Sequence, residues 1–170
     1  MTRIRHRQRR APGRASALCA LLLLGPGTAI AAVDCSVSTA GVAFGAYDVT
    51  LATPDDSTGT LNVTCTRVIL LDPSNVSYVL ALSRGTSGSY LMRQMASGAN
   101  RLDYNLYTNA AHSQVWGDGT GSSVTVSGSL SFGLVLLSQS ASHTMYGRVP
   151  ALQDVASSNY SDAIVVTITF

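Results

Sequence analysis

The chain of 170 residues contains no lysine and no glutamate, so its eleven basic side chains are all arginines and its nine acidic ones all aspartates. Lysine and glutamate are among the best helix formers for exposed positions, and their absence argues against a helical fold. Serine, threonine, valine and glycine are prominent instead, and these residues suit strands and tight turns. The composition therefore predicts an all-β protein.

The chain also lacks a hydrophobic run long enough to span a bilayer, which needs about 20 residues. The apolar run at 15–24 is too short. It follows a basic segment and precedes the small residues A-I-A at 29–31, the order found in a secretory signal peptide. We predict a signal peptide at 1–31 and one domain at 32–170 with no membrane span after cleavage. This implies export to the periplasm and then to the cell surface or the extracellular medium.

Removal of this leader reverses the sign of the charge. Six of the eleven arginines lie within it, which leaves five arginines against nine aspartates and a net charge of −4. A negative mature chain has no electrostatic attraction to nucleic acid or to anionic lipid. We therefore expect no nucleic-acid partner.

Cysteine is scarce, and Cys19 leaves with the leader. Cys35 and Cys65 remain, and an even pair in an exported chain favours a disulfide. The chain-entropy estimate for a loop of this length is roughly 3.7 kcal/mol. Two free thiols or a metal pair are the alternatives, but no histidine or acidic cluster accompanies either cysteine. We expect no metal and no other cofactor.

Alternation of apolar and polar residues predicts seven or so strands separated by turn signals. The expected strands are 35–43, 60–67, 76–83, 101–108, 124–136, 144–149 and 160–170. Residues 91–95 fit either a strand or one helical turn. Polar turn clusters lie at 54–59, 72–75 and 116–121. Many short strands at this spacing are typical of a sandwich or a barrel.

The last segment, Y-S-D-A-I-V-V-T-I-T-F at 160–170, is the most regular strand candidate. Its more apolar parity consists of Ile164, Val166, Ile168 and Phe170. A chain that ends inside such a strand offers a free edge and a terminal carboxylate. A free edge is either covered within the fold or offered to a partner strand.

Six blocks occur in order along residues 35–170. They are C-S-V-S at 35–38 with V-A-F-G-A-Y-D at 42–48, G-T-L-N-V-T-C at 59–65, L-D-Y-N-L-Y-T at 102–108, V-W-G-D-G-T at 115–120, Y-G-R-V-P at 146–150 with Gln153, and Y-S-D at 160–162. Taken together, they resemble the spore coat protein U domain family, which includes subunits of archaic chaperone–usher pili.

The resemblance implies an immunoglobulin-like antiparallel β-sandwich that lacks its final strand and is completed by a donor strand. The partners it implies are a periplasmic chaperone, the outer-membrane usher and neighbouring pilus subunits. We assign the docking of the chaperone or donor strand to Ile164, Val166, Ile168 and Phe170. Cleavage after Ala31 would leave three residues before Cys35, too few to act as a donor strand. We therefore expect a subunit that accepts a strand, as at a fibre tip.

Other site candidates have plainer explanations. His112 and His143 are in polar, loop-like stretches without a nucleophile motif, so we expect no enzyme and no catalytic residues. Trp116 is a candidate ligand contact, for example on an aromatic sugar platform, or else it caps the core. Asp118 fits a β-turn better than a calcium loop. Arg93, Arg101 and Arg148 are expected at the surface or in ion pairs.

The main functional hypothesis is therefore a secreted structural subunit of a chaperone–usher pilus or of a surface coat. The alternative is an exported adhesin or carbohydrate-binding module that is not built into a fibre. A secreted hydrolase is the weakest of the three hypotheses.

Overall fold

The computed structural model describes residues 33–68, 73–135 and 137–170. The predicted signal peptide lies outside these residues. The described residues form eight strands and no helix, as the composition predicts. Accordingly, this part of the chain contains no helix that could cross a membrane.

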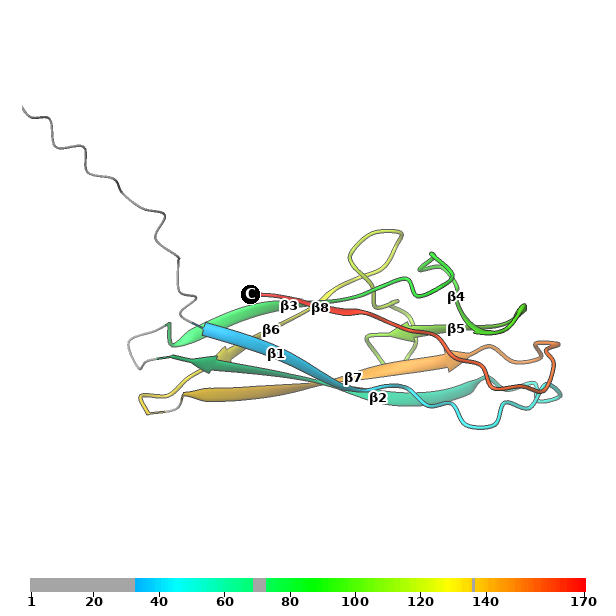
Figure 1. Ribbon diagram of the computed structural model, residues 1–170, viewed down its shortest axis with the longest axis horizontal. Helices are drawn as coiled ribbons and strands as arrows, with labels where there is room; N and C mark the ends of the chain where they lie inside the picture. Colours follow the sequence, from blue (N-terminus) through cyan, green and yellow to red (C-terminus); the bar gives the residue numbers. More distant parts are fainter. Residues whose placement is uncertain (1–32, 69–72, 136) are drawn as a thin grey trace, which may run out of the picture. The chain divides into compact units, whose positions relative to one another are not determined.

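The strands form two antiparallel sheets (Figure 1). The larger sheet has the order β1 (Val33–Ala40), β2 (Asp55–Arg67), β7 (Ser138–Val149), β5 (Asn100–Tyr107) and β4 (Arg93–Ser97). The smaller sheet has the order β6 (Val126–Ser131), β3 (Asn75–Leu82) and β8 (Val166–Thr169). The expected all-β antiparallel sandwich is confirmed, with β1 and β8 as edge strands of their sheets.

The core lies between the two sheets and follows the period-two alternation of the strands. Fully buried side chains come from both layers; they include Leu61, Val63, Cys65, Tyr78, Leu80, Leu82 and Val149. Burial of each such aliphatic side chain contributes roughly 1.5–3 kcal/mol. The inward parity of each strand is therefore fixed, because a one-residue slip would expose all of its apolar side chains.

Several strand limits differ from those expected. β2 begins at Asp55, inside the predicted turn, because its first residues pair with the end of β7 at Asp55↔Val149. β7 likewise begins at Ser138, six residues before the predicted start, as the partner of Thr66. β8 is shorter than expected and pairs only with β3. Pairing with a neighbour, rather than local composition, sets where these strands begin and end.

The disulfide between Cys35 and Cys65 is present, which confirms that prediction. The two residues are directly opposite in the β1–β2 register, with Cα atoms 4.0 Å apart. This short distance is typical of a non-hydrogen-bonded antiparallel pair. The bond fixes the edge strand β1 to its only neighbour in the sheet.

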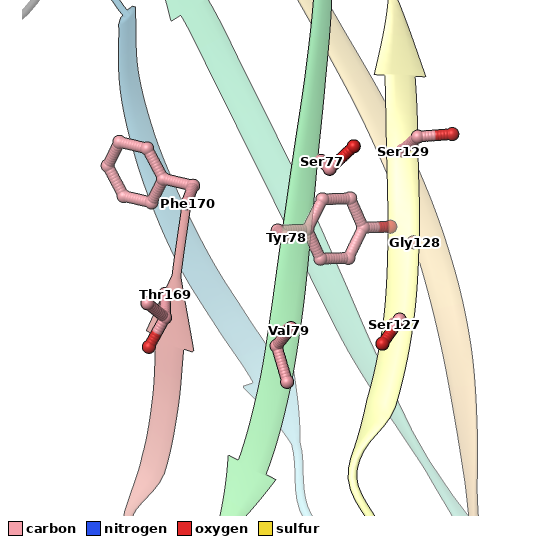
Figure 2. Close-up of a pocket in the computed structure, with 8 residues that line it drawn as sticks. All are labelled: Ser77, Tyr78, Val79, Ser127, Gly128, Ser129, Thr169 and Phe170. Carbon is pink, nitrogen blue, oxygen red and sulfur yellow. The ribbon is translucent and has the colours of Figure 1, made fainter.

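Tyr78 links the two sheets. Its hydroxyl is hydrogen-bonded to His143 Nε2 at 2.8 Å, and the two rings meet edge to face. The Tyr78 ring lies under Gly128 of β6, where an added Cβ would overlap the hydroxyl and the ring (Figure 2). His143 therefore belongs to β7 and faces inward, which corrects its expected place in a loop.

Replacement of Gly128 by alanine is expected to displace Tyr78 and break its contact with His143. Overpacking of this kind costs about 1–3 kcal/mol. Urea unfolding of the oxidised domain should show this loss. Gly41→Ala is the matched control, since nothing lies within 4 Å of a Cβ at Gly41 and its φ is not positive. Equal stability of the two variants would contradict the tight packing of Tyr78.

Burial lowers the pKa of His143 from its ordinary value of 6.5. The unfolded chain then binds a proton at a higher pH than the folded chain does. The stability that this histidine contributes is therefore complete above about pH 6.5 and is lost as the pH falls below it. Unfolding of the wild type and of His143→Gln is measured at about pH 7.5 and pH 5.5. The glutamine variant, which retains an acceptor for Tyr78, should lose less free energy of unfolding between these two pH values than the wild type does. An equal loss of stability in the wild type and the variant would show that groups other than His143 cause the pH dependence.

Candidate functional site

Two extended segments border an opening between the sheets. The first, residues 42–46, follows β1 and pairs with no strand in the part of the chain that the structure describes. The second, residues 160–165, leads into β8, and only Ser161 forms an isolated bridge, to Ala96. Both segments therefore have main-chain groups that no strand in the described chain uses.

A groove of about 260 Å³ lies between these two segments, and we call it the edge groove. Its floor comes from three strands of the larger sheet and consists of Met95, Tyr104, Leu106 and Met145. Its walls are Val42 and Phe44 on one side and Ile164 and Val166 on the other. The groove is thus mainly apolar, with extended main chain along both sides.

Gly147 positions the first wall. A Cβ at this residue would be 2.7 Å from atoms of both Val42 and Phe44, so only glycine lets the segment lie this close to β7. The Phe44 ring meets Tyr104 edge to face, with centroids 6.0 Å apart. Farther along, the Tyr47 hydroxyl donates to Pro150 O at 2.7 Å. These contacts hold the unpaired segment in one place.

Asp162 positions the second wall. Its carboxylate accepts hydrogen bonds from the Tyr104 hydroxyl at 2.8 Å and from Thr86 N and Oγ1 at 3.0 Å. Burial and the Asp162 carboxylate raise the pKa of Tyr104 above its ordinary range, so the phenol remains a neutral donor. Val165 O then accepts from Ser83 N at 2.9 Å. The chain thus crosses from the larger sheet at residue 161 to the smaller one at residue 165.

On the free edge of β8, the unpaired main-chain groups are those of the residues whose side chains face inward. In an antiparallel pair, successive residues alternate between pointing their N–H and C=O groups at the partner and away from it. Val165 bonds to Ser83 of the β3 side, so the main-chain groups of Val166 and Ile168 point away from β3. Their side chains are partly buried against the core. The same residues therefore place their hydrogen-bonding groups on the free edge and their apolar side chains in the space between the sheets.

The structure brings together three of the four residues predicted to dock a partner strand, and the exception is the last one, Phe170. Ile164, Val166 and Ile168 pack against the core, whereas Phe170 is 54% exposed. Phe170 lies instead beside an open hollow on the outer face of the smaller sheet, with a volume of about 560 Å³ (Figure 2). The other outward side chains there are Ser77, Val79, Ser127, Ser129 and Thr169. Whether the docking face binds a partner strand stays a prediction.

Trp116 is a core residue. It is 1% exposed, and its Nε1 donates to Leu80 O at 3.2 Å. A ring buried to this extent cannot present a face to a sugar, so the prediction of a ligand contact is wrong and the alternative, a core cap, is correct. Tyr104 is also buried.

Arg93 is the main feature that the sequence did not reveal, since it is fully buried and not at the surface or in an ion pair. Its guanidinium donates to Ser83 O at 3.1 and 2.8 Å, to Trp116 O at 2.7 Å and to Asn105 Oδ1 at 2.8 Å. Burial lowers its pKa. Arg93 thus joins the end of β3 to β4, β5 and the loop at Trp116. The only signal in the sequence is its position in a short strand, where inward parity is not evident.

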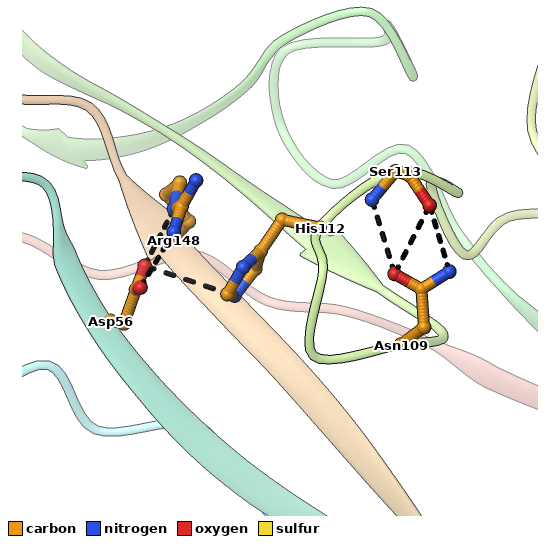
Figure 3. Close-up of polar contacts among 5 residues, drawn as sticks. All are labelled: Asp56, Asn109, His112, Ser113 and Arg148. Carbon is orange, nitrogen blue, oxygen red and sulfur yellow. Dashed lines mark hydrogen bonds and ion pairs between the residues drawn. The ribbon is translucent and has the colours of Figure 1, made fainter.

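One polar cluster on the outer face of the larger sheet contains the residue types of a hydrolase (Figure 3). Arg148 donates two hydrogen bonds of 2.7 Å to Asp56, which lower the pKa of that carboxyl and confirm the expected pairing. His112 Nε2 lies 3.7 Å from Asp56 Oδ1. The hydroxyl of Ser113, however, is hydrogen-bonded to Asn109. The histidine thus faces Asp56 and the serine faces Asn109, and these contacts anchor the turn at residues 109–113.

Metal ligation finds no support in the residues that the structure describes. These ranges contain no group of three or more histidine, cysteine or acidic side chains close enough to hold an ion. Asp118 instead accepts hydrogen bonds from Thr120 N at 2.9 Å and Thr120 Oγ1 at 2.6 Å, as expected for a turn.

Comparison with known proteins gives three findings. The Spore Coat Protein U domain matches residues 25–167. "Protein U" of Myxococcus xanthus is 33% identical over 117 residues, which cover 66% of this chain and 59% of that protein. A chain in the crystal structure of the CsuC–CsuE chaperone–tip adhesion subunit pre-assembly complex, from archaic chaperone–usher Csu pili of Acinetobacter baumannii, is similar with a TM-score of 0.49 and 20% identity. That alignment covers 81% of this chain and 40% of the other.

Proposed function

The chain belongs to the Spore Coat Protein U domain family, and we propose that it is an exported structural subunit that accepts a strand from another protein. The assembly would be a chaperone–usher type fibre or a surface coat. A terminal, tip-like place in a fibre depends in addition on the predicted cleavage after Ala31. The function is thus structural rather than enzymatic.

The edge groove is the observation that carries this proposal. It combines an apolar floor with the unpaired segment 42–46 on one side and the free edge of β8 on the other. An extended peptide placed there would bond to the main chain of Val166 and Ile168 and direct alternate side chains at the floor. This is β-strand addition, in which main-chain bonds provide affinity and side-chain pockets provide specificity.

The unprotected character of β8 supports the same role. Residues 163–170 contain no charged side chain and no proline, although these are the usual means by which proteins prevent pairing at a sheet edge. Such an edge associates with other strands unless it is covered. A periplasmic chaperone that covers it during export, an usher, and a neighbouring subunit that replaces the chaperone are the partners we propose.

A peptide-binding experiment tests the proposal. Oxidised residues 32–170 are mixed with a synthetic peptide of about nine residues that alternates valine and threonine, long enough to add one strand. The peptide is expected to raise the melting temperature, because each buried apolar side chain contributes roughly 1.5–3 kcal/mol. A peptide of the same composition with its valines grouped together is the control. A soluble monomer whose melting temperature neither peptide changes would show that the fold needs no added strand.

A further inference from the structure

The floor of the edge groove is rich in methionine. Three of the four methionines lie after the predicted leader, and two of them, Met95 and Met145, face this groove. The third, Met92, is on the surface and 48% exposed. The two floor methionines belong to different strands, β4 and β7, so they form two separate parts of the floor.

Met145 is 4% exposed, and the tip of its side chain packs closely over a glycine. Its Cε lies 3.0 Å from the position that a Cβ on Gly59 would occupy, so the tip of the side chain runs over a residue without a side chain. Met95 is only partly buried and packs at the margin of the core. Methionine is unbranched, with three rotatable bonds and a polarisable sulfur, and it fills spaces of different shape. The adaptability of the floor therefore rests on the methionine side chains themselves and not on empty space around them.

The walls of the groove have the opposite property. Val42, Ile164 and Val166 are β-branched and hence stiff at χ1. Phe44 is held between Gly147 and Tyr104. Stiff walls fix the path of an incoming strand, whereas an adaptable floor leaves open the size of the side chain that it receives.

We infer that the edge groove binds extended, alternately apolar strands of more than one sequence, and that Met95 and Met145 determine this tolerance by repacking around the donor side chain above them. The inference rests on the proposed function. Flexible, methionine-rich surfaces are a known basis of binding to several partners. A groove that accepts first one donor and then another needs such tolerance.

The test compares the wild-type protein with the double variant Met95→Leu/Met145→Leu, which nearly conserves volume but is branched and less adaptable. The probes are four peptides of about nine residues that alternate valine and threonine and carry alanine, valine, leucine or phenylalanine at one central apolar position. Wild-type dissociation constants for the valine, leucine and phenylalanine peptides are expected to agree within about fivefold. The double variant should bind one of these three peptides as tightly as the wild type does, and at least one other about tenfold or more weakly.

Met92→Leu is the control, and its peptide preferences should equal those of the wild type. If the double variant does not fold, the two single variants replace it. Each of them is then expected to narrow, in part, the range of peptides that bind with similar affinity. The inference is overturned if the variants show the same range of affinities as the wild type, or if the wild type itself separates the three peptides by more than about tenfold. Both of those results leave the proposed function intact. Failure of the wild type to bind any of the four peptides would instead overturn the proposed function, and the inference with it.

Discussion

Replacement of Arg93 by methionine is expected to lower the free energy of unfolding by about 2–6 kcal/mol, because two buried main-chain acceptors would lose the donor that satisfies them. The guanidinium is fully buried and donates to Ser83 O, Trp116 O and Asn105 Oδ1. Without it, Ser83 O and Trp116 O would lose this donor at a cost of about 1–3 kcal/mol each, whereas Asn105 Oδ1 would keep its hydrogen bond from Leu106 N at 3.0 Å. Urea unfolding of the oxidised domain, residues 32–170, measures the loss.

Two further variants make this result specific to the hydrogen bonds. Arg93→Lys keeps the charge but cannot reach three acceptors in different directions, so we expect a smaller loss that still exceeds about 1 kcal/mol. Arg101→Met is the matched control, since Arg101 is exposed and donates only to its near neighbours Gly98 O and Asn100 O. A loss of the same small size for the methionine variants at both positions would show that the buried network contributes little to stability.

The regular strands and the disulfide could be predicted from the sequence because their signals are local. The alternation at 76–83 and 101–108 gives β3 and β5 to within one residue at each end. The parity of residues 164–168 correctly gives the face that packs inward. The pairing of Cys35 with Cys65 follows from their number and the predicted export.

The features that could not be predicted depend on residues far apart in the chain. Arg93 resembles any surface arginine until Ser83, Asn105 and Trp116 are brought around it. The sequence predicts residues 42 and 43 as the end of the strand at 35–43, and the lack of a partner for the whole of 42–46 becomes visible only when the order of both sheets is known. The burial of Trp116 likewise depends on a loop that folds over the ends of β3 and β5. The edge groove is therefore a product of topology rather than of a motif.

The free edge of β8 predicts an asymmetric effect of proline. Because the N–H of Ile168 points away from β3, Ile168→Pro removes a donor that the described fold does not use, and proline is tolerated on an edge strand in this orientation. The N–H of Thr167 points toward β3, so Thr167→Pro should break a hydrogen bond of the sheet and destabilise the domain. Acidic replacements are less informative, since Val166 and Ile168 also pack against the core of the subunit itself.

We expect Ile168→Pro to abolish binding of the alternating valine–threonine peptide, or to weaken it at least about tenfold relative to Ile168→Ala. The alanine variant loses the same core side chain but keeps the N–H, so the two variants should unfold at similar urea concentrations. Any difference in peptide affinity between them then reports the main-chain bond at the free edge. If proline and alanine at residue 168 bind the peptide equally well, the incoming strand does not pair with β8, and the partner must be held by the side of the groove formed by residues 42–46.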